Sequence, residues 1–278
     1  MLADSPLAAW RVGDLVRRGC AAVVRWLRPG RRAVAEKTTP AKHAPAKPSA
    51  DAETRRRLVA VPIAVGAVVL IALGLPRTIG VLVSADGEPV LRKLQEQQPV
   101  SIEELSTLID AQQSGAFWLS DGRVLTDLGL GALLLSENLP RGDAAAGAAL
   151  QQAITALEEG VARAPANPYA WSRLAYARAL AEGWSPRAVA ALRLALITAP
   201  YEPRLLWSRL RMAFLAWPQM ASEDREVVFQ QVRWAWQANP AELARLAVEA
   251  KQLNLVRAAL LRTPEESLVF EEMVKPKR

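Results

Sequence analysis

The chain has 278 residues and a formal net charge of +7, with 51% hydrophobic and 23% charged residues. This length allows one large domain or two small ones, each able to bury a core without disulfide bonds. The single cysteine, Cys20, excludes a disulfide framework and a thiolate zinc site within the chain. The single histidine, His43, excludes a histidine metal cluster and argues against histidine-based catalysis, so we expect no metal site and no cofactor.

The positive charge is confined to the N-terminal part of the chain. Residues 1–57 carry 13 Lys and Arg against five acids, whereas residues 58–278 carry 22 against 23. A basic excess indicates nucleic-acid binding when it lies on a folded domain. Here it precedes the folded part, so we expect no nucleic-acid partner.

An uncharged run, LVAVPIAVGAVVLIALGL, follows the three arginines at 55–57 and covers residues 58–75. As a helix, this run would be roughly 27 Å long, close to the roughly 30 Å hydrocarbon core of a bilayer. A buried core helix is the alternative, but such helices rarely lack a polar face over this length. The sequence therefore predicts a transmembrane helix over 58–78, followed by a connector over 79–100.

The flanks of this helix predict its orientation. Basic residues are concentrated before the helix, and only Arg77 follows it closely, so the positive-inside rule places residues 1–57 in the cytoplasm. Cleavage as a signal peptide after Val83-Ser84-Ala85 is the alternative. That site lies ten residues beyond the apolar run, which is itself longer than a signal peptide requires, so an uncleaved single-span anchor is favoured.

The predicted cytoplasmic arm has two parts. In residues 1–28, Trp, Val and Leu alternate with arginines, which is typical of a basic amphipathic helix that lies on an anionic membrane surface or packs on a neighbouring subunit. Residues 29–57 are rich in Ala, Pro and Lys, and we expect a disordered linker in which His43 is solvated.

Beyond residue 100 the pattern is helical throughout, and the fold class is predicted as all-α. Ser101 with Glu104 forms a capping box, Ser185-Pro186 places a cap before a first-turn proline, and Thr263-Pro264 is followed by a capping-box Glu266. The longest β-like run is only Gly80–Val83. Residues 101–145 are expected to form N-terminal helices.

An internal repeat is the most informative feature of this region. The segment WSRLAYA at 171–177 recurs 36 residues later as WSRLRMA at 207–213, and LARL at 243–246 keeps the Arg and Leu after a further 36. Prolines at 165, 168, 200, 203 and 240 mark the junctions. Each unit therefore holds two helices in about 36 residues.

These residues resemble the tetratricopeptide repeat (TPR), whose pattern is W-x2-L-G-x2-Y, then A-x3-F, then P. Trp171-x2-Leu174 begins one unit, and Ala188-x3-Leu192 with Pro200 completes it. The chain departs from the pattern at Arg178, where an aromatic residue is usual, and at Arg211, where a small residue is usual. The resemblance implies a TPR-like helical-hairpin solenoid over 146–251, capped by helices in 252–278.

In such a solenoid the first helix of each pair lines the inner surface. The resemblance therefore implies a partner-binding groove, whose candidate residues are Tyr169, Ser172, Arg173, Tyr176, Leu205, Ser208, Arg209, Met212 and Arg245. The three arginines recur once per repeat. They either grip an anionic partner or pair with acids on neighbouring helices, whereas Trp171 and Trp207 take the family's packing position.

No nucleophile, phosphate-binding or metal-binding motif appears in the sequence, and adjacent carboxylates such as Glu158 and Glu159 point apart on a helix. We therefore expect a non-enzyme without a small-molecule substrate. A basic arm, one span and a repeat domain are together similar to accessory proteins of bacterial exopolysaccharide synthesis. This similarity implies a single-pass protein of the bacterial inner membrane whose periplasmic TPR scaffold binds proteins of an envelope complex.

Two other functions stay open. One is a periplasmic chaperone-like receptor that holds secreted polypeptides, as anchored repeat proteins of cytochrome c maturation or translocon-associated type do. Such a receptor should show a continuous apolar groove, whereas a docking scaffold should show one compact patch. The other is a glycan-active enzyme or glycan-binding module, which would need convergent carboxylates and stacked aromatics in one cleft.

Overall fold

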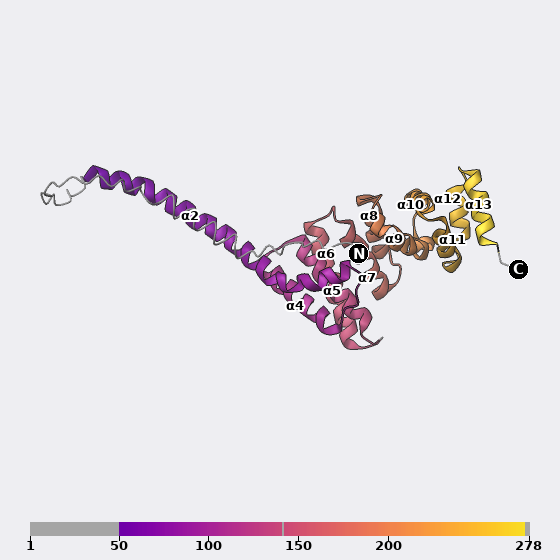
Figure 1. The fold of residues 1–278 in the computed structure, drawn as a ribbon, viewed down its shortest axis with the longest axis horizontal. Helices are drawn as coiled ribbons and strands as arrows, with labels where there is room; N and C mark the ends of the chain where they lie inside the picture. Colours follow the sequence, from indigo (N-terminus) through magenta and orange to yellow (C-terminus); the bar gives the residue numbers. More distant parts are fainter. Residues whose placement is uncertain (1–49, 141, 276–278) are drawn as a thin grey trace, which may run out of the picture. The chain divides into compact units, whose positions relative to one another are not determined.

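The structure is a computed structural model that describes residues 50–140 and 142–275, with side chains from Val59 onward (Figure 1). The chain divides at Val59 into two units, and all packing described below lies within the second unit, residues 60–278. The described residues form helices and contain no strand, which confirms the all-α fold class. The predicted arm 1–28, and the linker as far as residue 49 with His43, lie outside the described residues.

Helix α2 (Ala50–Ser84) contains the apolar run. None of its side chains between Val59 and Leu75 is buried, and the helix is long and apolar enough to cross a membrane. Its bounds differ from the predicted span 58–78: the helix begins eight residues earlier, within the segment expected to be a disordered linker, and ends six residues later. The β-like run Gly80–Val83 is part of this helix, and the described residues include no strand that could pair with it.

The last turns of α2 pack against α4 (Ile102–Trp118), and a 3₁₀ turn (Ala85–Gly87) and α3 (Glu88–Gln95) connect the two helices. Gly80, Gly87 and Gly115 allow this close approach; a Cβ on Gly115 would lie 2.9 Å from the Cβ of Ser84. The predicted capping box is confirmed. The amide of Glu104 donates to Ser101 Oγ at 3.2 Å, and the amide of Ser101 donates to Glu104 Oε2 at 3.0 Å.

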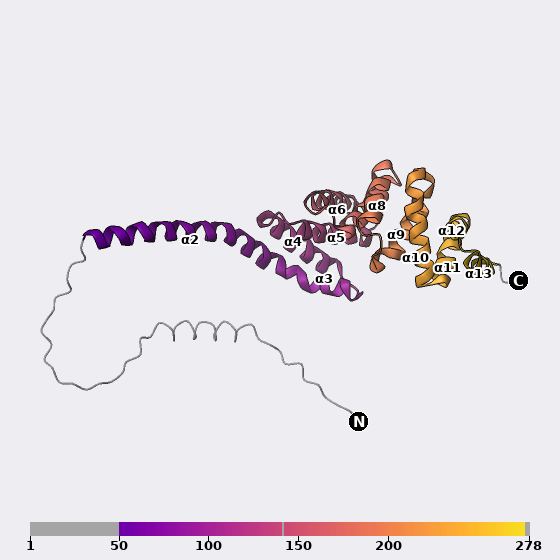
Figure 2. The same cartoon turned by 90° about the horizontal axis from the view of Figure 1, so that it is seen from above.

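The remaining helices pack against their neighbours in chain order (Figure 2). They are α5 (Gly122–Asn138), α6 (Ala144–Arg163), α7 (Pro168–Glu182), α8 (Pro186–Thr198), α9 (Pro203–Ala216), α10 (Arg225–Ala238), α11 (Pro240–Glu249), α12 (Leu253–Leu260) and α13 (Pro264–Val274). The pairs α5 with α6 and α7 with α8 have the most extensive contacts, and α7 also packs on α6 and α9.

Most of the later helices begin with a proline, which is pre-organised for the first helical turn and has no amide hydrogen to leave unpaired. Before these prolines, the side chains of Asn167, Ser185, Glu202 and Asn239 accept hydrogen bonds from first-turn amides. The predicted cap at Thr263 is wrong. Its hydroxyl instead donates to the carbonyl of Leu260 at 3.1 Å, so no side chain caps α13.

A continuous core, mostly of Ala, Leu and Val, runs from α4 to α13. The apolar positions of the 36-residue repeat lie within it. They are Leu174, Ala188, Leu192, Leu210, Phe214, Val228 and Val232, none more than 1% exposed. Trp171 and Trp207, which were expected to fill packing positions, are half-buried and lie against this core.

Candidate functional site

A groove of about 500 Å³ opens between α7 and α9, the helices that carry the recurring WSRL segment. It is mostly apolar, and one residue of α5 completes its wall. Its lining comprises Leu133 from α5; Ser172, Arg173 and Tyr176 from α7; and Leu205, Trp207, Ser208, Arg211 and Met212 from α9.

The structure brings six of the nine predicted partner-binding residues together in this groove: Ser172, Arg173, Tyr176, Leu205, Ser208 and Met212. Tyr169, Arg209 and Arg245 do not line it. The sequence reasoning missed Leu133, Trp207 and Arg211. Trp207 and Arg211 belong to the repeat, but we expected Trp207 to be core and read Arg211 only as a departure from the family pattern. Leu133 carries no sequence signal, because it comes from a helix outside the repeat.

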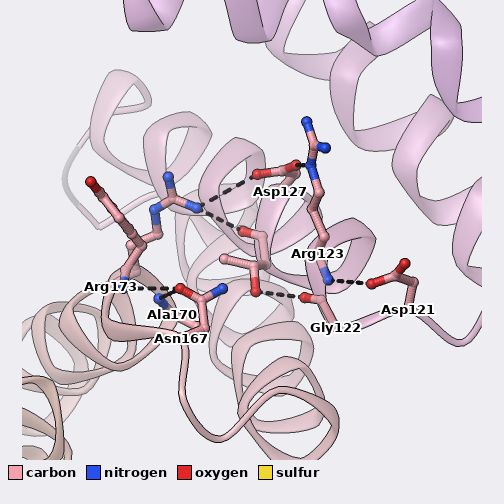
Figure 3. Close-up of polar contacts among 9 residues, drawn as sticks. Asp121, Gly122, Arg123, Asp127, Asn167, Ala170 and Arg173 are labelled. Atoms are coloured by element: carbon pink, nitrogen blue, oxygen red, sulfur yellow. Dashed lines mark hydrogen bonds and ion pairs between the residues drawn. The ribbon is translucent and has the colours of Figure 1, made fainter. Parts of the chain in front are cut away.

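Arg173 of α7 lines the groove and its guanidinium points toward Asp127 of α5 (Figure 3). Its Nη1 donates to the carbonyl of Thr126 at 3.3 Å and lies 3.7 Å from Asp127 Oδ1. Arg123 approaches the other oxygen of Asp127 at 3.8 Å (Figure 3). Arg173 therefore forms an ion pair with an acid on a neighbouring helix, and its side chain also borders the groove.

Burial dominates the electrostatics of this pair. It raises the pKa of the Asp127 carboxyl above its ordinary value, although Arg173 and Arg123 act in the opposite direction. Burial likewise lowers the pKa of the Arg173 guanidinium, and Asp127 offsets part of that change. The ion pair is thus only partly solvated, which makes its charges sensitive to anything that enters the groove.

The other two recurring arginines do not extend this line of charge. Arg209 is fully buried, and its Nη1 donates to the carbonyls of Ala195 at 2.9 Å and Ala199 at 2.8 Å. Arg245 is exposed and pairs with Glu242 and Glu249 on its own helix. The repeat predicted one shared role for these three arginines, but their neighbours differ, and of the three only Arg173 reaches both an acid on another helix and the groove.

Tyr176 forms part of the groove wall, and its hydroxyl donates to Glu137 Oε1 at 2.5 Å. Burial, with help from the hydrogen bond to Glu137, raises the pKa of Tyr176 to about 12. Tyr169 lies about two turns earlier on α7, beside Glu202. Burial is also the main reason that the pKa of Tyr169 is raised, and the side chain lies outside the groove lining.

Ser172 supplies an unusual polar group to the groove. The residue is only 5% exposed, and its Oγ has no hydrogen-bond partner among the residues that the structure describes. Buried hydroxyls in folded proteins nearly always have a partner. By contrast, Ser208 at the same position of the next repeat is exposed, and its hydroxyl donates to the carbonyl of Leu205 at 3.0 Å. The Ser172 hydroxyl therefore leaves unused hydrogen-bonding capacity in the wall of the groove.

Comparison with known proteins adds no constraint to this site. No protein-family model, curated protein or solved structure matches the chain.

Proposed function

We propose that the chain is a membrane-anchored, TPR-like scaffold whose groove between α7 and α9 docks a segment of a partner protein. The observation that carries the proposal is the groove itself, where a buried, unpartnered Ser172 hydroxyl lies within a mostly apolar wall. Mostly apolar concave sites with a few placed polar groups are typical of binding sites.

The TPR-like solenoid is supported by the order of the helices. Pairs of helices repeat along the chain, α7 and α9 begin 35 residues apart at Pro168 and Pro203, and the apolar positions of the repeat are buried. In stacked helical hairpins the first helices line one surface, and α7 and α9 are first helices of successive pairs.

The anchor is supported by α2, whose exposed apolar side chains would be unfavourable in water. The basic residues before it favour a cytoplasmic N-terminus. In a bacterial inner membrane this topology makes the helical domain periplasmic, where it is available to proteins of a cell-envelope complex, including one for exopolysaccharide synthesis or export.

The groove favours a peptide segment that carries one large apolar side chain next to an acid. Leu133, Trp207 and Met212 offer an apolar wall, and Arg211 adds an exposed cation at the opening that makes no ion pair within 4.0 Å with a described residue. Burying an apolar side chain of Leu or Phe size contributes about 1.5–3 kcal/mol. The Arg211 cation adds orientation through a charge-assisted hydrogen bond.

A docking scaffold agrees with this site better than a chaperone-like receptor of secreted polypeptides does. The groove is a single compact patch with walls from three helices. A receptor for many extended clients requires an apolar surface that continues along successive repeats. Arg209 is buried and Arg245 is paired with its own helix, so neither extends the groove toward the C-terminus.

The test is affinity purification of the full-length protein from its own membranes in mild detergent, with mass spectrometry of the proteins that remain bound. Ser208→Trp would fill the groove from an exposed position. Thr155→Trp places the same side chain at an exposed hydroxyl position of α6, outside the groove, and is the matched control.

We expect a defined set of envelope proteins to be recovered with wild type and with Thr155→Trp, and to be lost with Ser208→Trp. Equal recovery with both variants would exclude the groove as the docking site, and a broad mixture of secreted polypeptides would support the receptor instead.

A further inference from the structure

The end of α4 exposes two aromatic side chains next to the apolar helix α2. Phe117 is 82% exposed and Trp118 is 44% exposed, and their rings meet edge to face at a centroid distance of 5.4 Å. Neither ring belongs to the core clusters or to the groove between α7 and α9. A solvent-exposed aromatic pair of this size calls for a partner surface.

The position of this pair along α2 follows from backbone contacts. A Cβ on Gly80 would lie 3.3 Å from the Cβ of Trp118 and 2.8 Å from that of Leu119, whereas Gly115, one turn earlier on α4, approaches Ser84. Residues further along α4 therefore meet residues earlier on α2. The two helices run antiparallel here, and the C-terminal end of α4 points toward the apolar run of α2 (Figure 2).

Gly80 comes five residues after Leu75, where the uncharged run ends. At about 1.5 Å per residue, Gly80 lies roughly 8 Å beyond that end. The headgroup layer on each side of a bilayer is about 5–8 Å thick, given a hydrocarbon core of about 30 Å and a total of about 40–45 Å. If α2 spans the membrane, Trp118 is thus placed at headgroup depth.

The surface of α2 at this depth is also apolar. Val81 is 61% exposed and Leu82 is 73% exposed, although Arg77 has already ended the uncharged run. Together, Val81, Leu82, Phe117 and Trp118 form what we call the juxtamembrane collar. Polar side chains of α4, Asp110, Gln113 and Ser114, border the hollow next to the aromatic pair.

We propose that the juxtamembrane collar inserts into the lipid headgroup layer, with Phe117 and Trp118 as its aromatic anchors. This inference rests on the membrane anchoring within the proposed function. The surface that the collar contacts is the lipid bilayer that α2 itself would cross. Trp is enriched at this depth, where its apolar ring and its indole N–H are both satisfied, and Phe117 adds apolar surface beside it. Because α4 contacts α2 through glycines, the collar holds the first helices of the domain at a fixed depth.

Fluorescence quenching in proteoliposomes tests the collar in the full-length chain. Phe117→Cys, in a background with Cys20→Ser, carries an environment-sensitive nitrobenzoxadiazole label in vesicles of phosphatidylethanolamine and phosphatidylglycerol. We expect blue-shifted emission from the label at residue 117. Lipids that carry a nitroxide quencher on the headgroup should reduce the intensity of this emission by about half, because the label lies at headgroup depth. Quenching should be weaker when the nitroxide lies deep in the acyl chain.

Two further labels separate the collar from the anchor. Leu261→Cys is the matched control, because Leu261 is an apolar residue 73% exposed on the C-terminal part of the domain, and we expect neither shift nor quenching there. Val69→Cys, within the apolar run, reports the anchor and should be quenched most by the deep nitroxide.

Quenching at residue 69 with none at residue 117 overturns the collar and leaves the anchor intact. No quenching at residue 69 overturns the anchor itself. A blue shift at residue 117 without lipid quenching assigns the aromatic pair to a protein contact and also overturns the collar.

Discussion

The guanidinium of Arg209 donates a hydrogen bond of 2.8 Å to the carbonyl oxygen of Ala199, the residue that ends α8. The same Nη1 donates to Ala195 at 2.9 Å, and Nη2 reaches Pro200 at 3.4 Å. A cation at this position satisfies carbonyls that the helix end leaves without partners and complements the negative end of the helix dipole. Arg209 therefore joins α9 to the end of α8 and does not face a partner.

Replacing Arg209 should destabilise the fold. In Arg209→Met the buried carbonyl of Ala195 and the half-buried carbonyl of Ala199 lose their donor, and we expect the free energy of unfolding to fall by about 2–4 kcal/mol. Urea unfolding of the full-length protein in detergent, followed by circular dichroism, measures the change. Arg245→Met is the control, because Arg245 is exposed and pairs only within its own helix, and its midpoint should match wild type. Equal midpoints for Arg209→Met and Arg245→Met would contradict the structural role of Arg209.

Local signals in the sequence predicted the helices better than the roles of individual side chains. The capping box at Ser101 and the cap at Ser185 depend only on neighbours in the chain, and both are confirmed. Thr263 fails as a cap because its hydroxyl finds the carbonyl of Leu260 in the preceding turn. The Thr263 hydroxyl can bond either a first-turn amide of α13 or the carbonyl of Leu260. Backbone geometry that the residue types do not specify decides between these two partners.

The candidate site shows the same limit. Six groove residues could be predicted because the repeat places them on one face of successive helices. The arginines could not be separated, since Arg173 and Arg209 occupy the same repeat position but meet different neighbours. Arg173 lies opposite Asp127 of α5, whereas Arg209 lies opposite backbone carbonyls at the C-terminal end of α8. A sequence repeat defines the position of a side chain on its own helix, but not the group on the facing helix.

Two glycines in helices should respond oppositely to alanine. A Cβ on Gly129 in α5 would lie 2.5 Å from Leu157 Cγ, so the α5–α6 contact has no room for it. We expect Gly129→Ala to lower the free energy of unfolding by about 1–3 kcal/mol. Gly147 in α6 has nothing within 4 Å of such a Cβ, and Gly147→Ala should raise the free energy by up to about 1 kcal/mol through helix propensity. Urea midpoints of the two variants that shift in the same direction would contradict this packing.

The buried pair Asp127 and Arg173 predicts a pH effect on stability. Burial raises the pKa of Asp127 in the folded state above its ordinary value of 3.8, so the folded state favours the protonated carboxyl. This contribution to stability is fully present below pH 3.8 and is lost as the pH rises through the higher folded-state pKa. Asp127→Asn removes the titration, so its free energy of unfolding should rise relative to wild type over that acidic window.

Arg173→Met tests the same pair from the other side. Arg173 partly offsets the effect of burial on Asp127, so its removal should raise the pKa of Asp127 further and enlarge the loss of stability with rising pH. Free energies of unfolding, measured by urea at several pH values, give the slopes. If Asp127→Asn and wild type have parallel profiles through the acidic range, Asp127 is not the titrating group.

Tyr176 gives a spectroscopic signature of an intact groove wall. Its pKa of about 12 lies above the ordinary value of 10, because burial and the hydrogen bond to Glu137 favour the neutral phenol. The resulting stabilisation is fully present below pH 10 and is lost as the pH rises through about 12. In an absorbance titration of the tyrosines, Tyr176→Phe should remove a transition near pH 12. Glu137→Gln keeps a neutral acceptor but removes the carboxylate charge, so this transition should move toward pH 10 while burial holds it above that value. Loss of an ionisation near pH 10 in Tyr176→Phe would show instead that the Tyr176 hydroxyl is solvated and that the hydrogen bond to Glu137 is not formed.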